Sequence, residues 1–97
     1  MNVLPEVAAF APELVALRRD LHRHPELAFE ETRTADVVAR TLESYGLPIH
    51  RGLAGTGVVA SLRVGTSSRA IGLRADMDAL PLQELNGFAH SSAHAGR

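Results

Sequence analysis

Two stretches of the chain repeat apolar residues at helical spacing. In the first stretch, four apolar side chains follow the i, i+4, i+7, i+11 pattern of one helix face: Phe10, Leu14, Leu17 and Leu21. Pro12 suits the first turn of a helix, where no amide donor is needed. Pro25 disfavours helical geometry at His24 and should end the helix there. The pattern therefore predicts a helix over about residues 12–24.

The second stripe predicts a helix over about residues 31–45. Its members are Ala35, Val38, Leu42 and Tyr45, and it stops at Gly46, a residue type common just after a helix end. The connector HPELAFEE runs between the two predicted helices. We expect Leu27 and Phe29 to pack this connector against the core.

After Pro48 the apolar pattern changes to the period of two that is typical of strands. Residues 58–64 alternate in this way, and residues 71–75 repeat the alternation. Because the short polar turn GTSSR joins these segments, an antiparallel hairpin is the simplest prediction. Residues 49–51 are a candidate for a further short strand. Beyond Asp78 no periodicity holds, and the tail NGFAHSSAHAGR is predicted to be a loop.

The run GLAGTG, residues 52–57, is the one segment that suggests phosphate binding. Its glycine spacing differs from that of phosphate-binding loops, no Lys-Ser/Thr pair follows, and it leads into a predicted strand instead of a helix. We therefore predict a tight turn.

Length and composition indicate one modest globular domain. The 97 residues are 45% hydrophobic and 22% charged, with a formal net charge of -1. No basic run offers nucleic-acid phosphates a binding surface, so a nucleic-acid partner is not expected. The N-terminus lacks a basic leader region and no segment approaches a membrane span, which makes the cytoplasm the expected location. The sequence contains no cysteine, so it offers neither a disulfide nor a thiolate metal ligand.

Candidate chemistry centres on Asp76 and Asp78 in the stretch RADMDALPLQE. On an extended strand the two carboxylates would share a face, with their backbones about 6.5–7 Å apart. Such a pair could bind a metal, orient a ligating histidine, or act as acid and base. The alternative, which the residues alone favour, is a local salt-bridge cluster with Arg74 that caps the following loop.

Four histidines are weaker candidates. His22 and His24 are two positions apart, about 200° around a helix, so they cannot converge on one ion while the helix persists. We expect one of them to interact with the helix C-terminus and the other to be solvated. His90 and His94 have the spacing that chelates a metal on a helix, but Ser91, Ser92 and Gly96 favour a solvated loop.

Four segments taken together resemble one protein family. In order, they are RRDLHRHPELAFEETRT, GTGVVASL, IGLRADMDALPLQE and NGFAHSSAH. They are similar to the opening of the hippurate hydrolase and N-acyl-amino-acid amidohydrolase family, within the wider aminoacylase-like dinuclear metallopeptidase superfamily. The resemblance implies an α/β fold, namely the N-terminal part of a mixed-sheet, aminopeptidase-like catalytic domain with two helices followed by a β-hairpin.

The resemblance also implies a chemistry. Members hydrolyse the amide bond of an N-acyl amino acid with a water activated between two divalent metal ions, zinc, manganese or similar, and a glutamate as general base. The superfamily's metal-ligating histidine corresponds here to Asp76, as is usual in this branch. Asp76 and Asp78 are therefore expected at the edge of the metal site, where a carboxylate orients a ligand.

By the same resemblance, the family's first ligands belong to a Cys and His motif of the form H-A-C-G-H-D-G-H, which should begin where residue 97 ends the sequence. We therefore expect residues 1–97 to be a partial catalytic domain, with no catalytic residue, no metal ligand and no dimerisation domain among them, and inactive alone. The alternative is a non-catalytic interaction module, which would associate with itself or a partner through an open sheet edge.

Overall fold

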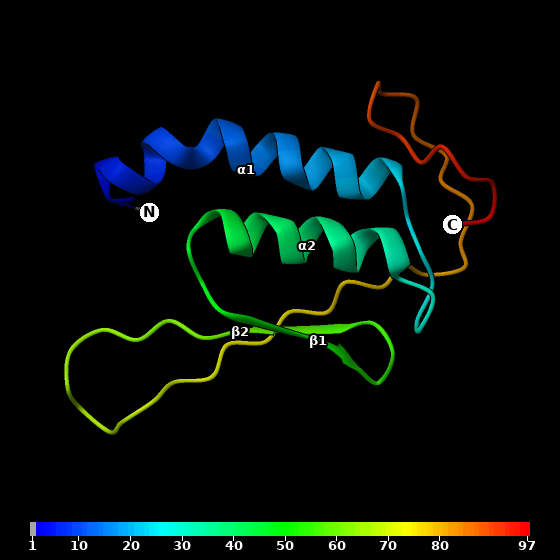
Figure 1. The fold of residues 1–97 in the computed structure, drawn as a ribbon. Coiled ribbons are helices and arrows are strands. Elements are labelled where there is room, and N and C mark those ends of the chain that lie inside the picture. Colours follow the sequence, from blue (N-terminus) through cyan, green and yellow to red (C-terminus); the bar gives the residue numbers. More distant parts are fainter. Residues whose placement is uncertain (1) are drawn as a thin grey trace. The chain divides into compact units, whose positions relative to one another are not determined.

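The computed structural model describes residues 2–97, in which two helices are followed by two strands (Figure 1). The described chain divides into two compact units. One unit contains the chain up to Pro25 together with Pro81–Arg97, and the other is Glu26–Leu80. No helix of the described part is long and apolar enough to cross a membrane.

Helix α1, Pro5–Arg23, belongs to the first unit. It begins earlier than predicted, because Pro5 takes the first-turn position that we had given to Pro12. Pro12 lies inside the helix, where it cannot donate a hydrogen bond to the preceding turn. The predicted end is confirmed, since His24 caps the helix with its N–H directed at the carbonyls of Asp20 and Leu21, each at 3.2 Å.

The tail of the same unit, residues 81–97, contains turns and bends but no helix or strand, as predicted. The N–H of Ala93 donates to the carbonyl of Arg23 at 2.8 Å, which joins the tail to the C-terminal end of α1. No described residue of α1 is buried.

Helix α2, Thr32–Ser44, opens the second unit and agrees with its prediction within one residue at each end. Gly46 follows in the left-handed region, with φ +79, and its N–H donates to the carbonyl of Glu43 at 2.9 Å. This is the C-terminal glycine expected from the sequence. The buried apolar residues are Ala35 and Ala39, one turn apart on one face of α2. These small side chains allow close packing but bury little apolar area.

The hairpin is antiparallel, as predicted, but its strands are β1, Ile49–Leu53, and β2, Gly57–Ala60. Figure 1 shows both beside α2, with which each is in contact. The predicted short strand at 49–51 is thus the true partner, and the predicted pairing of 58–64 with 71–75 is wrong. The predicted tight turn explains this: Gly52, Ala54 and Gly55 all have positive φ, which folds β2 straight back onto β1.

The segment from residue 61 to residue 78 contains no strand. Ile71 and Leu73 are 90% and 95% exposed, although they carry the alternation typical of a strand. Leu62 and Val64 are also exposed. An alternating pattern becomes a stable strand only where a neighbouring strand and a covering layer are present, and the described residues provide neither for this segment.

Candidate functional site

Asp76 and Asp78 lie in the irregular segment that leads to Ala79. The predicted strand exit is reduced here to a single bridge, in which Leu27 and Ala79 pair in parallel. Both aspartates are exposed. The structure therefore puts these carboxylates in one segment, but it does not hold them on one face of a regular strand.

Asp76 forms an ion pair with Arg74, with Nη2 and Oδ1 3.0 Å apart. Their side chains are 70% and 88% exposed, and ion pairs with this exposure contribute little to stability. Asp78 is exposed and lies outside this pair. The local salt-bridge alternative is thus confirmed for Arg74 and Asp76, but not for a cluster of three residues.

In the connector between the helices, Glu26 is hydrogen-bonded to the first turn of α2. One carboxylate oxygen of Glu26 accepts the N–H of Arg33 at 3.0 Å, and the other accepts the N–H of Thr34 at 2.6 Å. These are amides of the first turn of α2, which lack partners within the helix. The carboxylate of Glu26 therefore caps α2 from outside the helix, and its negative charge is favourably placed against the helix dipole.

The same contacts govern the ionisation of Glu26. Burial raises its pKa, but the hydrogen bonds from the Arg33 and Thr34 amides and from the Thr34 side chain, with the charge of Arg33, outweigh burial and lower the pKa overall. Glu26 is thus held in its anionic form. Its main-chain carbonyl meanwhile accepts the N–H of Ala79 at 2.7 Å, one residue after Asp78.

A second glutamate of the connector, Glu31, is only 7% exposed. The hydroxyl of Thr56, in the turn between β1 and β2, donates to its carboxylate at 2.6 Å. This hydrogen bond, together with one from the backbone amide of Glu31 itself, lowers the pKa of Glu31. Glu31 therefore ties the connector to the hairpin, while Glu26 ties it to α2 and Ala79.

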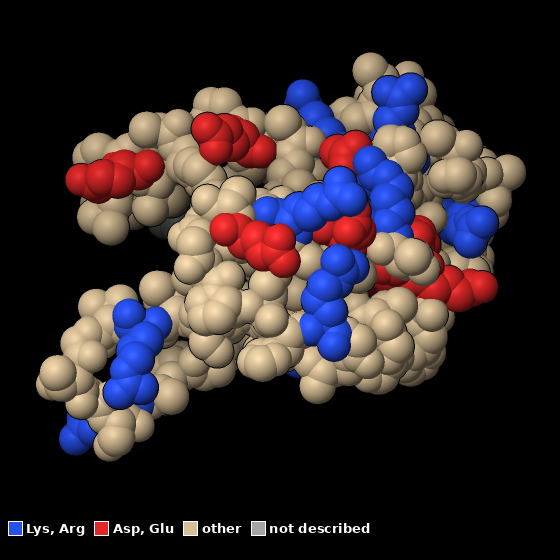
Figure 2. Space-filling view, in the orientation of Figure 1, with Lys and Arg blue, Asp and Glu red and all other residues tan. Residues whose placement is uncertain are grey.

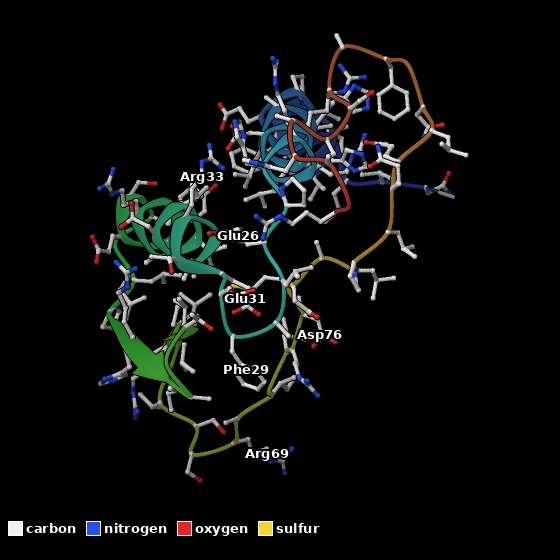
Figure 3. All side chains as sticks on the ribbon, turned by 90° about the vertical axis from the view of Figure 1, so that its right-hand side faces the viewer. Glu26, Phe29, Glu31, Arg33, Arg69 and Asp76 are labelled. Carbon is white, nitrogen blue, oxygen red and sulfur yellow. The ribbon has the colours of Figure 1, made fainter. Side chains whose placement is uncertain are left out.

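Between these anchors, Phe29 is 75% exposed and has a positive φ of 66. Figure 3 shows its side chain directed away from α2 (Figure 3). The expectation that Phe29 packs the connector against the core is therefore wrong, whereas Leu27 is half-buried. The glutamates on either side fix the connector through polar contacts, for which the apolar pattern gave no signal.

The histidines of the first unit do not converge on one ion. His22 Nε2 lies 2.8 Å from Glu84, whereas His24 Nδ1 lies 3.0 Å from the carbonyl of Asp20. The predicted interaction of one histidine with the helix C-terminus is confirmed for His24. Contrary to the prediction of solvation, His22 has a carboxylate partner.

The tail histidines lie in a loop, as predicted, and His94 is exposed, whereas His90 is half-buried against other rings, which corrects the prediction of solvation for His90. His90 stacks on Phe88 with ring centroids 4.0 Å apart and meets the ring of His22 edge-on at 5.8 Å. Loss of hydration lowers the pKa of His90, and the nearby charges of Arg19 and Arg18 lower it further. His94 meets the ring of His24 edge-on at 6.4 Å.

A metal centre needs at least three suitable side chains at one point. Among residues 2–97 no group of three or more His, Cys, Asp or Glu side chains could hold a metal ion. Asp76 and Asp78 are too exposed and too few to do so themselves. The described residues therefore do not fit a resident metal.

The charged side chains are of mixed sign. On the face that Figure 2 shows, acidic and basic side chains are interspersed and do not form a patch of one sign (Figure 2). All ten basic residues are arginines, set against eleven acidic ones. Such a surface does not have the single-sign field that attracts nucleic-acid phosphates.

The chain is similar in sequence to known hydrolases. No family model matches the chain. The chain is 44% identical over 92 residues to the hippurate hydrolase of Campylobacter jejuni, covering 95% of this chain and 24% of that protein. It is 46% identical over 85 residues to the N-acyl-L-amino acid amidohydrolase of Geobacillus stearothermophilus, covering 87% and 23%.

A solved structure agrees with these relatives. The Bacillus subtilis YxeP protein, described as a dinuclear metal binding peptidase from the M20 family, matches with a TM-score of 0.85 and 40% identity, over 92% of this chain and 25% of that one. The chain thus spans about a quarter of the length of the proteins it matches. Its sequence is therefore similar to about a quarter of a hippurate hydrolase and of an N-acyl-L-amino acid amidohydrolase, and its fold matches the N-terminal part of the dinuclear metal binding peptidase.

Proposed function

We propose that the chain supplies the N-terminal part of the catalytic domain of a cytoplasmic, metal-dependent amidohydrolase, which hydrolyses the amide bond of N-acyl amino acids such as hippurate. The observation that carries this proposal is the 44% identity to a hippurate hydrolase over 92 residues. The TM-score of 0.85 to a dinuclear metal binding peptidase also supports it.

This activity would use two divalent metal ions, such as zinc or manganese. Residues outside these 97 would bind the ions, and the general base would also be one of those residues. We assign Asp76 and Asp78 to the edge of the site, where carboxylates orient the groups that bind or react. The isolated chain should then bind no metal tightly and hydrolyse nothing.

A chimera tests the proposal. The segment of the Campylobacter jejuni hippurate hydrolase that matches this chain would be replaced by the chain itself, and hippurate hydrolysis would be measured with added manganese. We expect the chimera to be active and the same enzyme without the segment to be inactive. A folded chimera without activity would contradict the proposal, as would metal-dependent hydrolysis of hippurate by the 97 residues alone.

The two aspartates can be tested in the same chimera. Asp76→Asn with Asp78→Asn should lower kcat/KM by about tenfold or more, because changes to residues that orient a metal site typically have effects of this size. Glu43→Gln, on an exposed face of α2, is the control and should leave the rate unchanged. An unchanged rate in the double variant would remove Asp76 and Asp78 from the site.

One observation favours a second candidate function. Ile71 and Leu73 are almost fully exposed, and such residues can add a strand to another chain. A non-catalytic module that associates through this segment, with itself or with a partner, would bury them. Sedimentation of the 97-residue chain separates the two functions: a concentration-dependent dimer abolished by Ile71→Asp favours the module, and a monomer favours the enzyme fragment.

A further inference from the structure

Glu26 makes hydrogen bonds in two directions from one residue, with its side chain to α2 and with its main chain to Ala79. We propose that Glu26 is a positioning residue of the site, which holds the segment 76–79, with Asp76 and Asp78, at a fixed place beside the N-terminus of α2. This inference deepens the proposed function and rests on it for the role of the segment.

The side-chain contacts leave Glu26 little freedom. Its two carboxylate oxygens accept N–H groups from successive residues, Arg33 at 3.0 Å and Thr34 at 2.6 Å. A carboxylate that uses both oxygens in this way cannot rotate without losing a charge-assisted hydrogen bond. Helix α2 carries the buried residues Ala35 and Ala39, so Glu26 is attached to a packed helix of the second unit.

The main-chain contacts of residues 26 and 27 join the connector to the segment 76–79. The carbonyl of Glu26 accepts the N–H of Ala79 at 2.7 Å, and the next residue, Leu27, pairs with Ala79 in parallel. The segment has no regular strand pairing of its own in the described structure. The bridge to residues 26 and 27 is therefore the ordered contact nearest to Asp78.

Glu31 shows what a purely structural anchor in the same connector looks like. Its carboxylate accepts the hydroxyl of Thr56, in the β1–β2 turn, whereas the bridge to Ala79 is made by residues 26 and 27. Loss of the Thr56 hydroxyl should weaken the fold, because it leaves a buried carboxylate oxygen without its donor. It should not move Asp78, which makes Thr56→Val a matched control.

The first measurement is amide exchange in the full 97-residue chain. Glu26→Gln keeps the size of the side chain but removes its charge. The NH2 group of the glutamine would then face one of the two backbone N–H groups of Arg33 and Thr34, so two donors would meet. We expect the Ala79 amide to exchange about tenfold faster or more in Glu26→Gln and to be unchanged in Thr56→Val. Equal acceleration of Ala79 in both variants would overturn the proposal.

The second measurement is the rate of hippurate hydrolysis in the active chimera at saturating manganese. Small displacements of a site residue can lower rates strongly, so Glu26→Gln should reduce kcat/KM by about tenfold, mainly through kcat. Thr56→Val should stay within about twofold of the parent when both are assayed well below their melting temperatures. Ala79→Pro, which removes the N–H donor but leaves the cap of α2 intact, should reproduce the loss caused by Glu26→Gln.

The outcomes of the two measurements separate the proposals. If the unmodified chimera is inactive, the proposed function fails, and the exchange of Ala79 still decides whether Glu26 holds the segment. If the chimera is active and Glu26→Gln loses exchange protection at Ala79 without losing kcat/KM, Glu26 holds the segment without affecting the reaction, and its role as a positioning residue of the site is wrong.

Discussion

Nε2 of His22 lies 2.8 Å from Oε2 of Glu84, a contact that spans 62 residues of sequence within one compact unit. The other oxygen of Glu84 accepts the N–H of Ser92 at 2.5 Å, and the side-chain amide of Asn86 donates to Oε2 at 3.1 Å. Glu84 therefore organises the tail and joins it to the last turn of α1. No helical or strand period marks it in the sequence.

Removing the charge of Glu84 should release the tail. In Glu84→Gln, the hydrogen bonds from Ser92, Asn86 and His22 lose their charged acceptor, and charge-assisted hydrogen bonds are about twice as strong as neutral ones. We expect the amides of Ser92 and Ala93 to exchange several-fold faster, measured by NMR. Glu13→Gln, on an exposed face of α1, is the control, and equal exchange in both variants would contradict the assignment.

The ionisation of Glu84 gives a prediction for pH. The hydrogen bonds from Ser92, Asn86 and His22 lower its pKa from the ordinary 4.5 to about 2. Because the folded-state pKa lies below the unfolded one, the stabilisation is complete above pH 4.5 and is lost as the pH falls towards 2. Carboxyl carbon shifts should show Glu84 still ionised at about pH 3, when exposed glutamates are protonated. Titration of Glu84 near pH 4.5 would refute this.

Local patterns predicted the helices better than the pairings. The stripe that ends at Gly46 located α2 within one residue at each end, because periodicity and a C-terminal glycine are both local properties. The start of α1 was wrong, since Pro5 and Pro12 suit a first turn equally well. The hairpin partner was also wrong, because alternation shows that a segment can form a strand but not with which segment it pairs.

The candidate site was predictable only in part. The motif around Asp76 and Asp78 was recognisable as a sequence, and the structure confirms the ion pair with Arg74. The roles of Glu26 and Glu31 were missed because they contact residues seven to 25 positions away through polar groups. A glutamate six residues before a helix also differs from the usual Ser, Thr, Asp or Asn cap at the helix start, so no common signal indicated it.

The cap formed by Glu26 should be measurable as stability. Glu26→Ala removes the acceptor for the Arg33 and Thr34 amides, and loss of a helix cap lowers the free energy of unfolding by roughly 1 kcal/mol. Urea unfolding followed by circular dichroism measures the change. Glu43→Ala is the matched control, because an acidic residue in the last turn of α2 opposes the helix dipole and its removal should be neutral or slightly stabilising. Equal destabilisation by both variants would contradict the cap.

Asparagine at position 29 should relieve the backbone strain that Phe29 has. With φ at 66, Phe29 occupies the left-handed region, which costs a non-glycine residue about 1 kcal/mol or more, while asparagine tolerates it. Since the side chain is 75% exposed, little packing is lost. Phe29→Asn should therefore raise the free energy of unfolding by roughly 0.5–1 kcal/mol, whereas Phe29→Ala, which keeps the strain, should change it little. Destabilisation by Phe29→Asn would mean that the phenyl ring has a packing role.

Two glycines, one in β2 and one inside the exposed segment 61–78, should respond in opposite ways to alanine. A Cβ at Gly57 would lie 2.6 Å from the carbonyl oxygen of Leu53 and 3.1 Å from its Cβ, so β2 would have to move away from β1 at the irregular end of the hairpin. Overpacking of this kind destabilises by roughly 1–3 kcal/mol. A Cβ at Gly72 meets nothing within 4 Å.

Gly72→Ala should therefore be neutral or stabilise by up to about 1 kcal/mol, because alanine restricts the unfolded chain and nothing opposes it in the folded one. Thermal unfolding of the two variants beside the parent measures the contrast. The amides of β2 should lose exchange protection in Gly57→Ala and keep it in Gly72→Ala. If Gly57→Ala leaves both the melting temperature and β2 protection unchanged, the close approach of Leu53 and Gly57 in the hairpin register is wrong.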